Sequence, residues 1–314
     1  KRYLDDYGFA NFTLPMMGLA GMSFNRDGSG RLGPYRQGSE GYERLYGQAA
    51  MLVQKHMQEN GWLQKGYVYW YDEPEPKDYP YVSEGMRLIK RGAPQVRRML
   101  TEEPVPELFG DVDIWCPVES NLAPEATAAR QAEGETIWWY VCTGPKAPWP
   151  GLFIDHSAVD LRVWLWLTVR YNVQGVLIWT TNWWTSSAAF PNEPQNPWED
   201  PMGYVAGYGF QAGQVAYWGN GDGRLLYPPN RDVNADHRPY VEGPVNCIRW
   251  EMLRDGCEDW EYFYELRQAI AKARAARRPA GLLAEAEKLL TVPNEVVAAP
   301  TEFNPDPQPL LQHR

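Results

Sequence analysis

The chain has 314 residues, of which 44% are hydrophobic, so it can bury one large core or two smaller ones. Its formal net charge is −10, which argues against a nucleic-acid partner, because phosphates are bound largely by clustered Lys and Arg. No apolar run reaches the roughly 18 residues that a membrane span requires, so we expect no membrane span.

Strand-like and helix-like segments alternate along the chain. The patterns predict strands at residues 12–16, 67–71, 112–116, 137–142 and 176–180 and helices at residues 40–60, 82–100 and 158–171. This order is typical of parallel strands joined by right-handed crossovers, so the predicted fold class is α/β.

Within this class we expect a (β/α)8 TIM-type barrel rather than a doubly wound sheet. No Gly-rich fingerprint follows any predicted strand, and polar or aromatic residues crowd the strand ends. Five or six strands are recognisable instead of eight. Either the barrel is irregular, or its early units lie upstream of Lys1.

The composition changes between Thr181 and Pro244, where long loops are rich in Gly, Pro, Asn and Trp. Loops of this length in a compact domain are usually functional or disordered, and the many aromatic residues argue against disorder. A long helical stretch over residues 245–276 follows as a C-terminal extension, which Gly256 should weaken or bend. We therefore predict a catalytic domain over residues 1–290 and an extended Pro-rich tail over residues 291–314.

The segment YVYWYDEPEP, from Tyr67 to Pro76, ends a predicted strand with two adjacent carboxylates, Asp72 and Glu73. At the carboxyl end of a barrel strand, such side chains point into the mouth where active sites form. Neighbouring Cα atoms are about 3.8 Å apart, so both carboxylates approach a ligand from the same side. An acidic turn that caps the following helix is the structural alternative.

Adjacent carboxylates suit one type of glycoside chemistry better than another. In a two-carboxylate retaining glycosidase, the acid and the nucleophile flank the scissile bond from opposite sides. An adjacent pair instead allows one carboxyl group to protonate the leaving oxygen while its neighbour polarises a substrate group, and the substrate then supplies the nucleophile. We expect no metal and no cofactor, because the four His residues are scattered and the four Cys residues lack ligand-like spacing.

Four segments, taken in order, resemble the catalytic domain of glycoside hydrolase family 123 and its many uncharacterised relatives. They are YVYWYDEPEP, the stretch from Thr136 to Trp184 that begins TIWWYVC, GDGRLLYPP, and PVNCIRWEMLRDGCEDWEYFYEL. The similarity runs from about Tyr67 to Leu266. Characterised members carry an amino-terminal β-sandwich, and nothing here reads as one, so we expect either a chain cut from a longer protein or a divergent relative.

The resemblance implies a barrel enzyme that cleaves terminal β-linked N-acetylgalactosamine with retention of configuration. The 2-acetamido oxygen of the substrate is then the nucleophile, and an oxazolinium ion is the intermediate. The paired Asp-Glu of the family falls on Asp72 and Glu73. This implies that Glu73 is the general acid/base and that Asp72 orients the acetamido N–H and stabilises its developing positive charge.

Other strand ends supply candidate substrate-binding residues. Tyr71 ends the strand before Asp72. Trp138 and Tyr140 share one face of the strand predicted at residues 137–142, and Tyr140 is expected to hydrogen-bond the acetamido carbonyl. A wall for stacking on the sugar is expected from Trp179, Asn182 and Trp183.

Glu119 and Asn121 follow the strand at residues 112–116. Glu119 is the leading carboxylate nucleophile if the substrate lacks an acetamido group.

The predicted function is therefore a retaining exo-β-N-acetylgalactosaminidase with a carbohydrate as its partner. Two alternatives remain: a glycosidase of the same fold that acts on a non-acetamido glycan with Glu73 as acid and Glu119 as the distant carboxylate, and a non-catalytic carbohydrate-binding protein. The sequence assigns neither the oligomeric state nor the compartment, although a signal upstream of Lys1 would direct the protein to the periplasm or the exterior.

Overall fold

The structure is a computed structural model that describes residues 1–20, 30–206, 211 and 214–314. Two compact units divide the chain, Lys1–Trp139 and Tyr140–Arg314, and each is described by itself. Within these described ranges, no helix combines the length and the apolar character that crossing a membrane demands.

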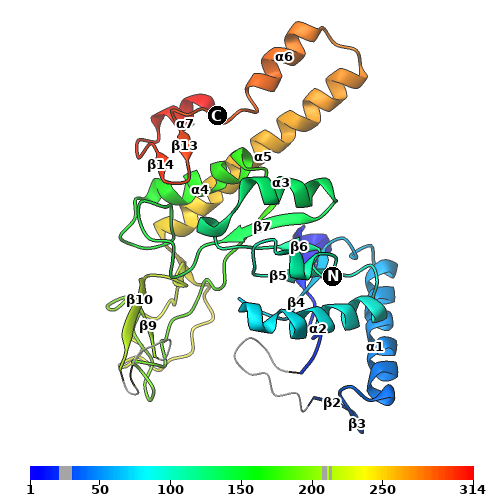
Figure 1. The fold of residues 1–314 in the computed structure, drawn as a ribbon. Coiled ribbons are helices and arrows are strands. Elements are labelled where there is room, and N and C mark those ends of the chain that lie inside the picture. Colours follow the sequence, from blue (N-terminus) through cyan, green and yellow to red (C-terminus); the bar gives the residue numbers. More distant parts are fainter. Residues whose placement is uncertain (21–29, 207–210, 212–213) are drawn as a thin grey trace. The chain divides into compact units, whose positions relative to one another are not determined.

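The first unit alternates strands and helices around a parallel sheet (Figure 1). Its elements are η1 (Arg2–Asp6), β1 (Phe12–Thr13), β2 (Arg31–Leu32), β3 (Tyr35–Arg36), α1 (Glu40–Glu59), β4 (Gly66–Tyr69), η2 (Pro76–Asp78), α2 (Tyr79–Gly92), β5 (Arg97–Leu100), η3 (Pro106–Leu108), β6 (Ile114–Trp115), η4 (Glu119–Asn121), α3 (Pro124–Ala132) and β7 (Thr136–Tyr140). The strands pair in parallel in the order β1-β4-β5-β6-β7. The predicted α/β class is thus confirmed, although the described residues do not form a complete (β/α)8 barrel.

Apolar residues of the strands and of α2 form the core of this unit. Val68, Met99 and Ile114, from three adjacent strands, are each 0% exposed, as are Met86 and Ile89 on α2. Strands buried on both faces read as short apolar runs, which is typical of parallel sheets. The predicted helix at residues 40–60 is confirmed by α1, whose first turn is capped by the Ser39 hydroxyl, which accepts the Tyr42 amide hydrogen bond at 3.3 Å. α1 packs against α2 (Figure 1).

The helix predicted over residues 82–100 is wrong at its C-terminal half. α2 ends at Gly92, and β5 follows at Arg97–Leu100. Pro94 cannot donate a helical hydrogen bond, and it disfavours the helical conformation of the residue before it. The short run RRML then pairs with β4, and periodicity alone does not distinguish so short a buried strand from a helix.

A close approach between α2 and the end of β4 positions the segment that carries Asp72 and Glu73. A Cβ atom on Gly85 of α2 would lie 2.3 Å from the indole ring of Trp70. Trp70 is 3% exposed and contacts Tyr71 and Tyr81 through its ring. Only glycine at position 85 therefore lets the helix pack this closely against the residues that follow the strand.

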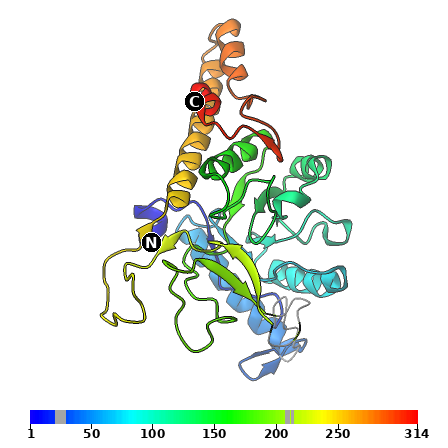
Figure 2. The same cartoon turned by 90° about the vertical axis from the view of Figure 1, so that its left-hand side faces the viewer.

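The second unit contains the helical core and the aromatic-rich loops. Its elements are α4 (Ala158–Arg170), β8 (Gly175–Leu177), β9 (Met202–Val205), β10 (Ala216–Asn220), β11 (Leu226–Tyr227), β12 (Val245–Asn246), α5 (Ile248–Ala275), α6 (Ala280–Lys288), β13 (Val297–Ala299), β14 (Glu302–Phe303) and α7 (Gln308–His313). α4 lies along α5, and α6 folds back beside the end of α5 (Figures 1 and 2). The predicted long helix is confirmed by α5.

α5 continues through Gly256. A Cβ atom at this position would lie 3.0 Å from the Leu165 side chain of α4, tighter than an ordinary contact, so glycine suits the close packing of the two helices. The segment predicted as an extended tail, residues 291–314, contains the β13–β14 hairpin and α7, with Val297 and Leu310 buried.

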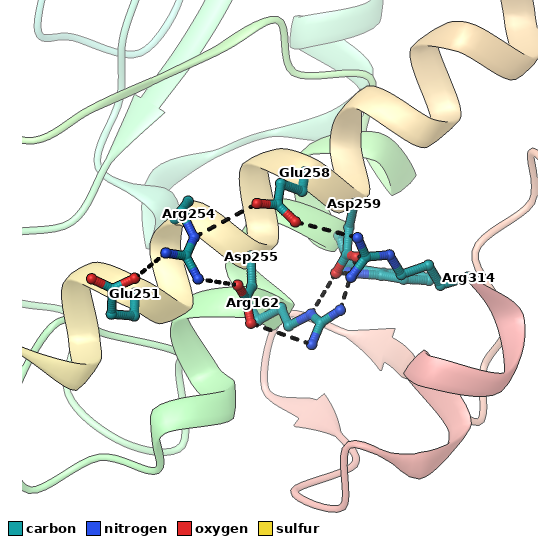
Figure 3. Close-up of polar contacts among 8 residues, drawn as sticks. Arg162, Glu251, Arg254, Asp255, Glu258, Asp259 and Arg314 are labelled. Carbon is teal, nitrogen blue, oxygen red and sulfur yellow. Dashed lines mark hydrogen bonds and ion pairs between the residues drawn. The ribbon is translucent and has the colours of Figure 1, made fainter.

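A network of charged side chains ties α5 to α4 and to the C-terminal residue (Figure 3). The Arg162 guanidinium donates to both carboxylate oxygens of buried Asp259, at 2.5 and 2.9 Å, and Trp166 Nε1–H donates to Asp259 at 2.8 Å. On the exposed face, Arg254 pairs with Glu251 and Glu258. This placement indicates that the charged residues of α5 have a structural role.

Candidate active site

Asp72 and Glu73 lie three and four residues after the end of β4, at the edge where the parallel strands end. Asp72 is half-buried and Glu73 is exposed. Glu73 has a backbone φ of 45°, in the left-handed region that residues other than glycine rarely adopt. Such strained residues persist where the surroundings fix them, and they concentrate at functional sites.

Two hydroxyl groups hold the Asp72 carboxylate. The Tyr69 hydroxyl of β4 donates to Asp72 Oδ1 at 2.5 Å, and the Thr101 hydroxyl, which follows β5, donates to the same oxygen at 2.7 Å. Thr101 Oγ1 also accepts the Glu73 amide hydrogen bond at 2.8 Å. Burial, and then the negative charge of Asp72, raise the pKa of Tyr69, so the phenol stays protonated and acts as a donor.

A second acidic pair, Glu102 and Glu103, follows the neighbouring strand. The parallel register pairs Tyr69 with Met99, so Asp72–Glu73 and Glu102–Glu103 occupy equivalent positions beyond β4 and β5. Burial, together with the charge of Glu103, its hydrogen bond and the charge of Glu73, raises the pKa of Glu102 to about 8. Glu102 therefore retains its proton near neutral pH.

Glu119 and Asn121 lie on η4, after β6. Glu119 is 1% exposed, and neither of its carboxylate oxygens has a hydrogen-bond partner among the described residues. Burial raises its pKa to about 9. Asn121 is exposed, and its Nδ2 donates to Glu103 Oε2 at 3.4 Å, so Asn121 adjoins the acidic pair after β5.

The remaining candidates of the first unit are packed aromatic residues. Tyr71 is 0% exposed, and its ring lies edge-on to Trp70 and Tyr81. Trp138 on β7 lies edge-on to Tyr67 on β4, with ring centroids 5.2 Å apart. Tyr140 is the first residue of the second unit and is buried.

In the second unit, Trp179 and Trp183 form a cluster with Trp218. The Trp179 ring stacks on Trp218 at 6.0 Å and lies edge-on to Trp183 at 5.2 Å. Trp179 is 38% exposed, so part of its surface remains accessible to a ligand. Asn182 is exposed, and its backbone forms a β-bridge with Arg224.

A buried carboxylate supports this tryptophan cluster. Trp179 Nε1–H donates to Asp222 Oδ2 at 3.2 Å, while Asp222 Oδ1 has no hydrogen-bond partner in the described part of the chain. Burial raises the pKa of Asp222, an effect that the Trp179 hydrogen bond and the Lys146 charge oppose. Gly223, with φ of +69°, brings the turn against the Trp179 ring, where a Cβ atom would lie 2.9 Å away.

The sequence profile described as "Glycoside hydrolase 123, catalytic domain" matches residues 22–266. The chain belongs to glycoside hydrolase family 123. Its fold is also similar to that of a solved family 123 glycoside hydrolase from Clostridium perfringens, with a TM-score of 0.52 and 20% identity, over 81% of this chain and 38% of that one. The chain thus spans less than two-fifths of that protein. A search of curated proteins finds no match.

In this family 123 domain, sequence reasoning missed the residues that hold Asp72. Tyr69 was recognisable only as a strand residue, and Thr101 comes directly after the segment predicted as a helix. The signal that could have found Thr101 is the strand register, because the Tyr69–Met99 pairing brings residue 101 level with residue 71, next to Asp72. Trp218, and the contact of Asp222 with Trp179, were hidden by their distance in sequence from Trp179.

No group of three or more His, Cys, Asp or Glu side chains that could hold a metal ion occurs among the residues the structure describes.

Proposed function

We propose that this family 123 domain is a glycoside hydrolase, a retaining exo-β-N-acetylgalactosaminidase that uses substrate-assisted catalysis. The 2-acetamido oxygen attacks the anomeric carbon as the glycosidic C–O bond breaks, and Glu73 gives its proton to the leaving oxygen. Water then opens the oxazolinium ion and transfers a proton to Glu73, which returns the enzyme to its starting state.

The position of Asp72 and Glu73 on consecutive residues after β4 is the observation that carries this proposal. Because they follow one strand, they approach the substrate from one side, which leaves the opposite side to the substrate's own acetamido group. The hydroxyls of Tyr69 and Thr101 fix Asp72 Oδ1, which suits a carboxylate that orients the acetamido N–H and offsets its positive charge. The exposed Glu73 side chain suits a group that exchanges protons with substrate and water.

The burial of Glu119 favours this mechanism over the two-carboxylate alternative. A carboxylate nucleophile must be ionised, and a pKa of about 9 keeps Glu119 protonated at neutral pH. Binding of the sugar is assigned to the remaining candidates: stacking to Trp179 and Trp183, and polar contacts to Asn182, Asn121 and the Tyr140 hydroxyl. Trp138 and Tyr71 shape the surface beneath the substrate.

We further propose that the β/α units over residues 1–290 belong to an irregular (β/α)8-type barrel. The parallel order of β1, β4, β5, β6 and β7, with acidic pairs after β4 and β5, supports this architecture.

Hydrolysis of matched aryl β-glycosides with and without a 2-acetamido group tests the function. We expect turnover of the β-N-acetylgalactosaminide, weaker turnover of the β-N-acetylglucosaminide, and none of the β-galactoside. Turnover of the β-galactoside alone would contradict substrate assistance, and binding of N-acetylgalactosamine without any turnover would indicate a carbohydrate-binding protein.

A further inference from the structure

One hydroxyl group connects the two proposed catalytic residues. Thr101 is 3% exposed, so it does not lie at the surface that a substrate would reach. It follows β5, whose parallel pairing with β4 brings it level with Tyr71, the residue before the Asp-Glu pair. Any effect of Thr101 on the reaction must therefore act through the groups that it holds.

The hydrogen bonds of Thr101 have a defined direction. An amide N–H can only donate, so Thr101 Oγ1 accepts from Glu73, and its single proton is directed to Asp72 Oδ1. Tyr69 donates to the same Asp72 oxygen, and its hydroxyl also interacts with the Thr101 hydroxyl. Thr101 thus contacts both proposed catalytic residues directly, whereas Tyr69 contacts Asp72 and Thr101.

The amide that donates to Thr101 Oγ1 belongs to Glu73, the residue with the strained backbone conformation. Glu73 holds φ of 45°, a left-handed conformation that is unfavourable for an L-residue. The Thr101 hydroxyl fixes the amide of this peptide and hence the direction from which the Glu73 side chain leaves the backbone. Without it, the backbone can relax and move the carboxyl group.

We propose that Thr101 is a positioning residue that couples the orientation of the Asp72 carboxylate to the backbone conformation of Glu73. This inference rests on the proposed function, because it assigns Thr101 a part in the same reaction. Loss of the hydroxyl disturbs both carboxyl groups at once, whereas loss of the Tyr69 hydroxyl disturbs Asp72. Misplacement of a reacting group by about 1 Å costs up to about 10²-fold in rate.

The test compares Thr101→Val, Thr101→Ser and Tyr69→Phe with the wild type in two measurements. Inhibition by a thiazoline mimic of the intermediate reports on Asp72. The dependence of kcat on the pKa of the leaving group, over a series of aryl glycosides, reports on proton donation by Glu73. Thermal melting is recorded for every variant, so that unfolded protein is not mistaken for misplaced groups.

We expect Thr101→Val to weaken thiazoline inhibition about tenfold and to lower kcat about 10- to 100-fold on poor leaving groups, with KM nearly unchanged. Thr101→Ser should stay within about threefold of the wild type in both measurements, because the hydroxyl is retained. Tyr69→Phe should weaken thiazoline inhibition and leave the leaving-group dependence unchanged.

Two results would overturn the coupling: a folded Thr101→Val with wild-type leaving-group dependence, or a Tyr69→Phe that steepens this dependence as much as Thr101→Val does. If Thr101→Val does not fold, the comparison of Thr101→Ala, which lacks the hydroxyl, with Thr101→Ser, which keeps it, tests the coupling in the same two measurements. A wild type that thiazoline does not inhibit would remove the substrate-assisted mechanism, and the leaving-group series would still decide the role of Thr101.

Discussion

Glu73 is the residue whose chemistry can be isolated most directly, because proton donation matters only when the leaving group is poor. Glu73→Gln should lower kcat about 10³-fold on an alkyl or disaccharide substrate and less than about tenfold on a dinitrophenyl glycoside. Glu84→Gln, on the exposed side of α2, is the matched control and should keep wild-type turnover. Equal losses on both substrates would assign Glu73 a role other than that of proton donor.

Glu119 gives a prediction about stability and pH. Burial raises its folded pKa from 4.5 to about 9, so the folded state retains a proton that the unfolded state releases as the pH rises through this range. Glu119 therefore lowers the free energy of unfolding progressively from about pH 4.5 to about pH 9, with little effect below pH 4.5. Glu119→Gln does not titrate, and its stability relative to the wild type should increase by about 2 kcal/mol or more between pH 5 and pH 8.

Urea denaturation of wild type and Glu119→Gln at both pH values measures this difference. A stability difference that stays constant between pH 5 and pH 8 would mean that the Glu119 carboxyl group titrates alike in the folded and unfolded chains.

At the scale of elements, the contact between α4 and α5 depends on a buried charge. Asp259→Ala leaves Arg162 without its closest carboxylate and Trp166 without its acceptor, with only Asp255, 3.9 Å from Arg162, as a substitute. We expect a loss of about 3 kcal/mol in the free energy of unfolding, measured by urea denaturation. Arg254→Ala removes only exposed pairs and should cost less than about 1 kcal/mol. Similar losses in the two variants would count against this interpretation.

The elements that the sequence predicts well are those with strong local signals. The amphipathic pattern with Ser39 at its start predicts α1, and the apolar run of residues 158–171 predicts α4. β5 was missed because four residues after a helix carry too little periodicity to separate strand from helix. The close contact of Gly256 with Leu165 was not predicted, because it depends on the packing of α4 against α5, which local sequence does not encode.

In the candidate site, too, the sequence identifies residues with a local signal and leaves out those that only the fold brings together. Asp72 and Glu73 are visible in the sequence because they end a strand and precede two prolines. Tyr69 and Thr101 become visible only through side-chain direction and strand register, which sequence periodicity leaves open. The contact of Asp222 with Trp179, 43 positions away along the chain, likewise becomes visible only in the folded structure.

At the scale of the whole molecule, each unit carries its own set of chemically distinctive residues. The first unit carries the paired carboxyl groups with their hydroxyl partners, and the second carries the tryptophan cluster with its buried aspartate. Substrate assistance is the central claim of the proposed function, since it assigns the nucleophile to the substrate's acetamido group.

Inhibition of the wild type and of Asp72→Asn by a thiazoline mimic of the oxazolinium ion tests this claim most directly. The wild-type inhibition constant should lie at least about 10²-fold below the substrate KM, because the mimic resembles the transition state. Asp72→Asn should lose most of that affinity, and its kcat should fall by roughly 10² to 10³. Equal, weak inhibition of both proteins, together with a covalent fluorosugar adduct on Glu119 or another carboxylate found by mass spectrometry, would contradict it.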